Sequence, residues 1–312
     1  MHKNSRIFIA GHTGLIGSAI FESLRNQGYQ NLICIDRRNL DLTDQNAVDI
    51  FFTHTKPQFV FLAAGKVGGI LENTSYPANF ITENLAIQLN VLRASHRINV
   101  ERLILFGSSC MYPRECSQPM NENALLTGHP EPTSIAYAIA KLAGVQMCQA
   151  YNRQFGENKY IPIIPNSVYG PNDDFSQSGH VLSSLIVKFH NAKKNSLKEV
   201  VLWGTGRPKR EFIYSADVAS ACINLMSCDL SDIELPLNLG CGSDISIFDL
   251  AKLIAQIVGY NGEIKWDSTK PDGAPRKLLD SQRLRALGWS PTVDLQGGIK
   301  SLYQSYCQNC AS

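Results

Sequence analysis

The first half of the chain alternates short apolar runs with longer segments that have the apolar spacing of helices. Four of these runs, "RIFIAG", "NLICID", "FVFLAAG" and "RLILFG", are rich in β-forming residues. Strands that alternate with helices of this length indicate βαβ units and a parallel sheet. A fifth run, "YIPIIPNSVYG", predicts the next strand, and its two prolines place that strand near a sheet edge or end it in a loop.

The pattern changes after Gly170. The polar loop "PNDDFSQSGH" precedes a predicted helix in "VLSSLIVKFHNAKK" and two short strands in "EVVLWGTGRPKREFIY". Next come a helix in "SADVASACINLM" with Ser215 or Asp217 near its cap, the strand "PLNLG", the helix "ISIFDLAKLIAQIVG", the strand "EIKWD", the loop "KPDGAPRK" and two closing helices. No low-complexity linker separates the two halves, so we expect the second lobe to be interleaved with the first.

These elements predict an α/β fold: a Rossmann-type, doubly wound parallel sheet with a smaller α/β C-terminal lobe. We assign residues 1–169, with roughly 213–240, to a dinucleotide-binding domain. Residues 170–212 and 241–312 are assigned to a substrate-binding lobe.

Composition narrows the class of protein. The 312 residues are 44% hydrophobic and 18% charged, which is enough for one large core with a smaller lobe. A net charge of +2 gives no electrostatic basis for binding nucleic acid or a membrane surface. The apolar runs are far shorter than a membrane span, and the N-terminus enters a strand pattern without a signal peptide. We therefore expect a cytoplasmic protein without nucleic-acid or membrane partners.

The cysteine content indicates reduced thiols. Nine cysteines are scattered through predicted helices, strands and loops, which does not fit a disulfide framework. Cys307 and Cys310 have CxxC spacing on a polar C-terminal tail, but no second pair or nearby histidine completes a zinc site. We expect no metal.

A glycine-rich segment joins the first strand to the first helix. In "IFIAGHTGLIGSAI", Gly11, Gly14 and Gly17 allow a tight turn and a close approach of the backbone to a pyrophosphate. The G-x-x-G-x-x-G spacing is one residue longer than the usual dinucleotide fingerprint, but it opens a βαβ unit as the motif requires. The segment predicts nucleotide binding.

The end of the second strand bears on which dinucleotide binds. Asp36 lies 19 residues after Gly17, where a carboxylate holds a ribose 2′-hydroxyl and favours NAD. Arg37 and Arg38 follow it and favour the 2′-phosphate of NADP. The residues alone leave this choice open.

Tyr137 and Lys141 in "YAIAK" are spaced to share one face of a helix. A neighbouring ammonium lowers a tyrosine pKa, so Tyr137 would be able to pass a proton to a carbonyl oxygen near neutral pH. Ser108 follows the fourth predicted strand, 29 residues before Tyr137. Because the ends of parallel strands share the ligand-binding edge, the three residues together indicate a carbonyl reductase.

Several motifs together resemble one family over nearly the full length of the chain. They are "GHTGLIGSAI", "LAAGKVGGI", "GSSCMYP", "YAIAKLAG", "YGPND", "WGTGRPKREF" and "KPDGAPRKLLD", and they are similar to those of GDP-L-fucose synthases, which are extended short-chain dehydrogenases/reductases. Enzymes of that family use NADPH to convert GDP-4-keto-6-deoxy-mannose to GDP-L-fucose, by epimerisation at C3 and C5 and reduction of the C4 ketone. The resemblance also implies a homodimer, formed through helices in residues 79–97 and 137–153.

The resemblance assigns catalytic roles by motif. It implies that Ser108, Tyr137 and Lys141 form the reductase triad, and that Cys110 and His180 form the epimerisation pair. Protons on C3 and C5 are acidic because both carbons flank the C4 carbonyl. A thiol with a pKa of about 8.5 and an imidazole with a pKa of about 6.5 suit their removal and return.

The resemblance also implies binding residues. The NADPH site, for which NADH is left open as an alternative, would comprise Gly11, Gly14, Leu15, Ile16, Gly17, Asp36, Arg37, Asp41, Leu42, Ala63, Ala64 and Lys141. The GDP-4-keto-6-deoxy sugar would be bound by an aromatic face, cations and hydroxyls. These residues would be Ser109, Ser167, Lys188, Trp203, Arg210 and Lys277.

Three positions depart from the family pattern. Ser167 stands where the family has asparagine in "PTN", Asp174 makes "DDF" of the family's "DNF", and Thr13 replaces an arginine of some members. The first two bear on whether a hexose or a heptose is accepted and on whether epimerisation is retained. The alternative is a C4-reductase with little or no epimerisation that acts on a GDP-4-keto-6-deoxy-heptose or dideoxyhexose in surface polysaccharide synthesis. A nucleotide-sensing regulator is a further alternative, but it would not need all three triad residues.

Overall fold

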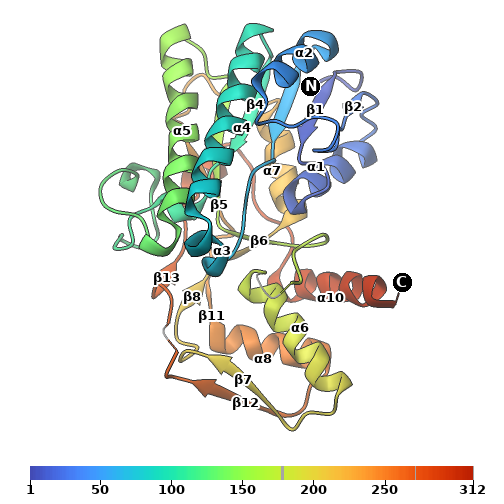
Figure 1. The fold of residues 1–312 in the computed structure, drawn as a ribbon, viewed down its shortest axis with the longest axis vertical. Helices are drawn as coiled ribbons and strands as arrows, with labels where there is room; N and C mark the ends of the chain where they lie inside the picture. Colours follow the sequence, from blue (N-terminus) through green and yellow to red (C-terminus); the bar gives the residue numbers. More distant parts are fainter. Residues whose placement is uncertain (177–178, 271, 312) are drawn as a thin grey trace.

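The computed structural model describes residues 1–176, 179–270 and 272–311, and it contains a six-stranded parallel sheet with helices on both faces (Figure 1). The strand order is β10-β5-β4-β3-β1-β2, which confirms the predicted Rossmann-type fold. Its strands are β1 Ile7–Ala10, β2 Leu32–Ile33, β3 Phe59–Leu62, β4 Arg102–Phe106, β5 Tyr160–Pro165 and β10 Leu237–Leu239. The chain reverses its direction of travel across the sheet at β1, so the loop after β1 lies at the switch point where such sheets bind ligands.

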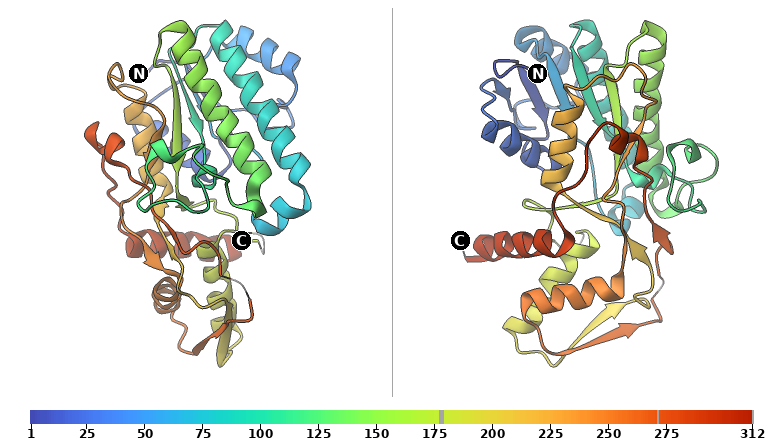
Figure 2. Two further views of the ribbon diagram at one scale, coloured as in Figure 1. Left: turned by 90° about the vertical axis from the view of Figure 1, so that its left-hand side faces the viewer. Right: turned by 180° about the vertical axis from the view of Figure 1, so that it is seen from behind.

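Alternate residues of each strand contribute to different cores. Ile7 and Ile9 of β1 pack in one core with residues of α1 and α7, whereas Phe8 and Ala10 pack in a second core with residues of α2, α4 and α5. Figure 2 shows α4 and α5 side by side. The bounds are α1 Leu15–Asn26, α2 Gln45–Thr55, α4 Pro77–Arg97, α5 Ile135–Phe155 and α7 Ser215–Leu225.

The run "YIPIIPNSVYG" forms two strands where the sequence predicted one. β5 lies between β4 and the edge strand β10, and it ends at Pro165. The chain then leaves this sheet, and β6 (Ser167–Tyr169) pairs instead with β9 (Phe212–Tyr214). The change of partner strand ends β5 at this residue, since Pro162 lies within the same strand, opposite Leu105 of β4, without ending it.

A second lobe lies below the sheet in Figure 1 and has its own apolar core. It contains α6 Val181–Lys194, β7 Glu199–Trp203, α8 Ile247–Val258 and β12 Glu263–Asp267. β7 and β12 form a parallel pair, and a three-stranded sheet contains β11 Ile245–Ser246, β8 Lys209–Arg210 and β13 Arg276–Lys277. Residues 199–214 thus form three strands, where the sequence predicted two. The boundaries assigned to the two domains stay a prediction.

The C-terminal segment is helical. Cys307 and Cys310, which the sequence placed on a polar tail, belong to α10 (Leu295–Ala311). The apolar residues Leu295, Ile299 and Leu302 fix this helix against the second lobe. The remaining helices are α3 Ile70–Ser75 and α9 Gln282–Ala286, with short 3₁₀ helices at Ser109–Met111, Glu122–Ala124 and Pro132–Ser134.

Two features of the described residues bear on the class of protein. Within the described residues, no cluster of His, Cys, Asp and Glu side chains has the arrangement of a metal site. None of the helices in the same part of the chain has the length and apolar character that a membrane span requires.

Candidate active site

The glycine loop forms a tight cradle between β1 and α1. Gly11 has a φ of +83°, and its carbonyl oxygen accepts a hydrogen bond from Gly14 N at 3.0 Å. A Cβ atom at Gly17 would lie 2.0 Å from that same oxygen, so only glycine fits there. Gly14 caps α1 without a side-chain hydrogen bond, and the first turn carries no acidic residue. The free N–H groups and the helix dipole therefore suit the diphosphate of a dinucleotide.

This geometry predicts different effects for two glycine variants. Gly17→Ala forces a methyl group into the Gly11 carbonyl, so we expect it to lower the free energy of unfolding by about 1–3 kcal/mol. Gly14→Ala is the matched control, because its Cβ would lie 3.5 Å from the same oxygen at an ordinary φ of −81°. Chemical denaturation measures both variants, and equal losses of stability would contradict the packing argument.

Most of the other predicted cofactor residues lie near this edge of the sheet, but the Leu42 side chain is buried in the core. Leu15 and Ile16 form the first turn of α1, and Ala63 and Ala64 directly follow β3, against Gly11. Asp41 accepts hydrogen bonds from Thr43, which lower the pKa of its carboxyl. The Leu42 side chain, however, is buried in the core beneath α2 and α4. Only its backbone is left to face a ligand.

The residues that bear on the choice between NAD and NADP make contacts with different parts of the fold. The Asp36 carboxylate lies 3.6 Å from Nε2 of His12, which is part of the glycine loop. The exposed Arg37 guanidinium lies 3.1 Å from a Glu83 oxygen on α4. The Asp36 carboxylate thus contacts the glycine loop, whereas the Arg37 guanidinium is paired with a carboxylate of α4.

Ser108, Tyr137 and Lys141 meet at the end of β4. Ser108 caps the 3₁₀ helix at Ser109–Met111, and its hydroxyl is close enough to Tyr137, in the first turn of α5, to lower the pKa of the phenol by hydrogen bonding. Lys141 lies one turn later, is buried, and donates from Nζ to the Phe106 carbonyl at 3.0 Å. Its Nζ lies 5.9 Å from the centre of the Tyr137 ring. The arrangement places a hydroxyl, a phenol and an ammonium around one point.

The electrostatics of this cluster differ from the expectation based on spacing. Burial raises the pKa of Tyr137 above its ordinary value, and the nearby Cys110 thiol adds to the rise, whereas the Ser108 hydrogen bond lowers it. Burial also lowers the pKa of Lys141 to about 8. The expected net lowering of the tyrosine pKa is therefore wrong for this structure, because desolvation dominates the pKa of the buried phenol. A phenol with a high pKa stays protonated and available as a proton donor.

Cys110 shares the loop with Ser108. It is a free, half-buried thiol whose backbone N–H donates to Ser108 Oγ at 3.3 Å. Its negative charge, when ionised, adds to the rise that burial causes in the Tyr137 pKa and opposes the fall that burial causes in the Arg210 pKa, so the thiol acts on groups of both lobes.

His180 is the N-cap residue of α6, and its side chain is 57% exposed. Its Nδ1 atom lies 3.5 Å from an oxygen of Asp173, a buried carboxylate that the sequence analysis did not single out. The hydrogen bond to Asp173 raises the pKa of His180, although burial opposes it. The only sequence signal for Asp173 was its position in "PNDD" shortly before the histidine. Gln177 and Ser178 of this loop lie outside the described residues.

The predicted substrate residues fall into two groups. Arg210 of β8 and Lys277 of β13 are register partners on neighbouring parallel strands, and Lys277 lines a pocket together with Ser109. Ser167 begins β6.

The second group lies at the end of β7, where the Trp203 side chain is 68% exposed. The Lys188 Nζ of α6 lies 6.0 Å from its ring centre. Lys270, which begins the motif "KPDGAPRKLLD" but was not among the predicted site residues, lies 5.6 Å from the same centre.

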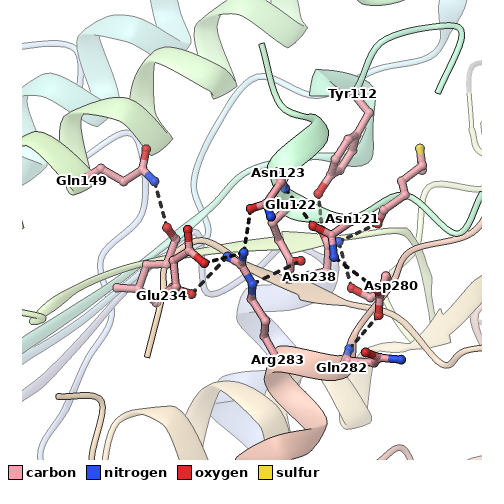
Figure 3. A network of polar contacts seen from close by, with 12 residues as sticks. Tyr112, Asn121, Glu122, Asn123, Gln149, Glu234, Asn238, Asp280, Gln282 and Arg283 are labelled. Atoms are coloured by element: carbon pink, nitrogen blue, oxygen red, sulfur yellow. Dashed lines mark hydrogen bonds and ion pairs between the residues drawn. The ribbon is translucent and has the colours of Figure 1, made fainter. Parts of the chain in front are cut away.

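A buried polar network anchors the loop that carries Ser108 and Cys110 (Figure 3). Tyr112 Oη donates to Asn238 Oδ1 of β10 at 2.7 Å, and Asn238 N donates to a Glu122 oxygen at 2.9 Å. The Arg283 guanidinium of α9 lies 3.7 Å from Glu122. Buried, hydrogen-bonded groups of this kind fix a unique conformation, so the network positions the active-site loop.

Known proteins match this chain over nearly its whole length. The profile of the NAD dependent epimerase/dehydratase family matches residues 7–239. The "GDP-L-fucose synthase 1" of Arabidopsis thaliana is 48% identical, over 98% of this chain and 94% of its own length. The GDP-L-fucose synthase of Escherichia coli K12 is 44% identical, over 98% of both chains.

Solved structures agree with this sequence relationship. The GDP-mannoheptose C4 reductase of Campylobacter jejuni with NADP bound has a TM-score of 0.90 and 38% identity, over 98% of this chain and 99% of its own. Fold, glycine cradle and sequence likeness thus agree, and the chain belongs to the NAD dependent epimerase/dehydratase family and, within it, to the GDP-L-fucose synthases.

Proposed function

We propose that the protein is an NADPH-dependent enzyme that converts GDP-4-keto-6-deoxy-mannose to GDP-L-fucose, by epimerisation at C3 and C5 and reduction at C4. One observation carries the proposal. Cys110 lies in the same loop as Ser108, beside Tyr137, so groups suited to the ketone and to the carbons next to it share one site. The GDP-L-fucose synthases at 44–48% identity carry out the conversion that their name states.

Epimerisation uses the acidity of C3 and C5. The Cys110 thiolate removes a proton from the carbon beside the ketone, and the electron pair moves onto the C4 oxygen as an enolate. The His180 imidazolium returns a proton to the opposite face of that carbon, which inverts it. The raised pKa of His180 suits a proton donor at neutral pH.

Reduction follows on the same ketone. Ser108 donates a hydrogen bond to the C4 oxygen, and Tyr137 transfers a proton to it. NADPH, when bound, supplies the hydride that C4 receives, so that the carbonyl becomes an alcohol. Lys141 lies beside Tyr137, and its ammonium stabilises the negative charge that the phenol acquires when it gives up its proton.

NADPH is the proposed cofactor, and NADH is its alternative. The glycine cradle fits the diphosphate that both share. The related Campylobacter jejuni reductase has NADP bound, and Arg37 and Arg38, which follow Asp36 in the sequence, are the proposed partners of the 2′-phosphate. Comparing KM for NADPH and NADH tests the preference, and Arg37→Ala should raise KM for NADPH alone.

The GDP moiety is proposed to bind along the second lobe. The exposed Trp203 ring, flanked by Lys188, provides an aromatic face for the base, and Arg210 with Lys277 provides cations for the phosphates. We also propose that residues 1–169 and 213–240 form the NADP-binding domain and that the remainder of the chain binds the GDP-sugar. A homodimer through α4 and α5 is part of the same proposal.

A C4-reductase of a GDP-4-keto heptose is the second candidate. Ser167, which the sequence analysis found in place of the family's asparagine, begins β6, and a GDP-mannoheptose C4 reductase is among the similar structures. Supplying matched GDP-4-keto-6-deoxy hexose and heptose substrates with NADPH separates the two candidates. We expect a higher kcat/KM for the hexose, and a clear preference for the heptose would favour the second candidate.

A further inference from the structure

A buried carboxylate supports the imidazole of His180. The Asp173 side chain is 2% exposed, and its Oδ1 atom lies 3.5 Å from His180 Nδ1. Oδ1 also accepts a hydrogen bond from Asp174 N at 2.8 Å, and Oδ2 accepts one from Ser183 Oγ at 2.5 Å. With both oxygens held, the carboxylate has a fixed orientation, which it can impose on the more exposed ring.

The loop that carries Asp173 is itself attached to the cofactor side of the fold. Asp173 N donates to the Gly170 carbonyl at 3.1 Å, and Asn172 Nδ2 donates to Ser18 Oγ of α1 at 3.1 Å. A Cβ atom at Gly170 would lie 2.2 Å from Ser215 Oγ, so the start of the loop packs closely on α7. Asp173 is therefore fixed relative to the helix that opens the glycine cradle.

The charges around His180 oppose one another. The imidazole stands at the N-terminus of α6, where the helix dipole disfavours a cation. The first turn of α6 carries no acidic residue, and the first charged residue of that helix is Lys188. Asp173 and, to a smaller extent, Asp174 favour the protonated ring, and the net result is a raised pKa. The carboxylates of the preceding loop thus raise the His180 pKa by more than desolvation lowers it.

We propose that Asp173 is a positioning residue for the epimerisation: its carboxylate accepts Nδ1–H of His180, fixes the ring and its tautomer, and leaves Nε2 to deliver the proton to the sugar carbon. This inference rests on the function proposed above. The proton leaves Nε2 for the enolate carbon, while the second proton stays bonded to Nδ1 and is donated to the Asp173 carboxylate. The neutral imidazole then regains a proton at Nε2 from solvent. A carboxylate behind a catalytic imidazole determines which nitrogen exchanges protons.

The first test is an NMR titration, which needs no activity. The chain has seven histidines, and His180→Asn identifies the resonance of His180 by its loss. We expect a His180 pKa above the ordinary value of about 6.5 in the wild type, and a fall of about one unit in Asp173→Asn. Asp174→Asn, the matched isosteric change one residue later, should lower it less. A wild-type pKa at or below the ordinary value overturns the proposal, as does an equal pKa in wild type and Asp173→Asn.

The second test is the pH dependence of deuterium exchange at C3 and C5. His180 donates only when protonated, so the wild-type rate falls as pH rises through its raised pKa. Asp173→Asn should move this fall to lower pH by about one unit and leave reduction of an already epimerised ketone close to wild type. Superimposable pH profiles would overturn the positioning role. Wild-type protein without any exchange would instead contradict the proposed epimerisation, while the NMR titration would still test the Asp173–His180 pair.

Discussion

Tyr137→Phe is expected to lower kcat for ketone reduction by about 10²–10⁴-fold. The substitution removes only the hydroxyl that transfers the proton to the C4 oxygen, and the ring keeps its edge contact with Phe80. Because burial raises the pKa of Tyr137, the wild-type phenol remains protonated and ready to donate. NADPH oxidation followed by its absorbance measures the effect.

The control for this variant lies on the same helix. Tyr151→Phe removes a hydroxyl from a half-buried tyrosine near the other end of α5 and should reduce the ketone at a rate close to wild type. Tyr137→Phe should also retain deuterium exchange at C3 and C5, since that step uses other residues. Near-normal reduction by Tyr137→Phe would remove the phenol from the mechanism.

Cys110→Ser is expected to lower the rate of C3 and C5 deuterium exchange by about 10²–10⁴-fold. An alcohol is too weak an acid to supply the base that a thiolate provides, although its size is similar. Reduction of a ketone that is already epimerised should continue near the wild-type rate, because Ser108, Tyr137 and Lys141 are unchanged. Proton NMR in deuterated water follows the exchange, and NADPH oxidation follows the reduction.

Cys116→Ser provides the matched control, because Cys116 is another half-buried free thiol in the segment that follows the same loop. It should exchange C3 and C5 at the wild-type rate. Should Cys110→Ser exchange as fast as Cys116→Ser, Cys110 would be a structural residue and the base would have to be sought elsewhere.

The fold and the location of the site could be predicted from local patterns. The alternation of apolar strands with helices predicts the parallel sheet, and Gly11, Gly14 and Gly17 mark its nucleotide edge. These features depend on neighbours in the sequence, so they can be read without a structure. The Tyr137–Lys141 spacing likewise predicts one helical face, and both residues lie on α5.

The remaining features depend on tertiary surroundings. Burial decides the direction of the Tyr137 pKa, and spacing alone led to the opposite expectation. The division of the strand at Pro165 depends on which partner each half meets, and the helix around Cys307 depends on its packing against the second lobe. Asp173 was missed because a carboxylate in a polar loop looks like a solvated charge until the structure buries it.

The most direct test of the central claim is one reaction in deuterated water. Wild-type protein is incubated with GDP-4-keto-6-deoxy-mannose and NADPH, and the product is examined by NMR. We predict GDP-L-fucose that carries deuterium at both C3 and C5, because each inversion returns a solvent-derived proton to carbon before C4 is reduced. A reduced GDP-6-deoxy-hexose that keeps the substrate's configuration and its original hydrogens at C3 and C5 would contradict the account.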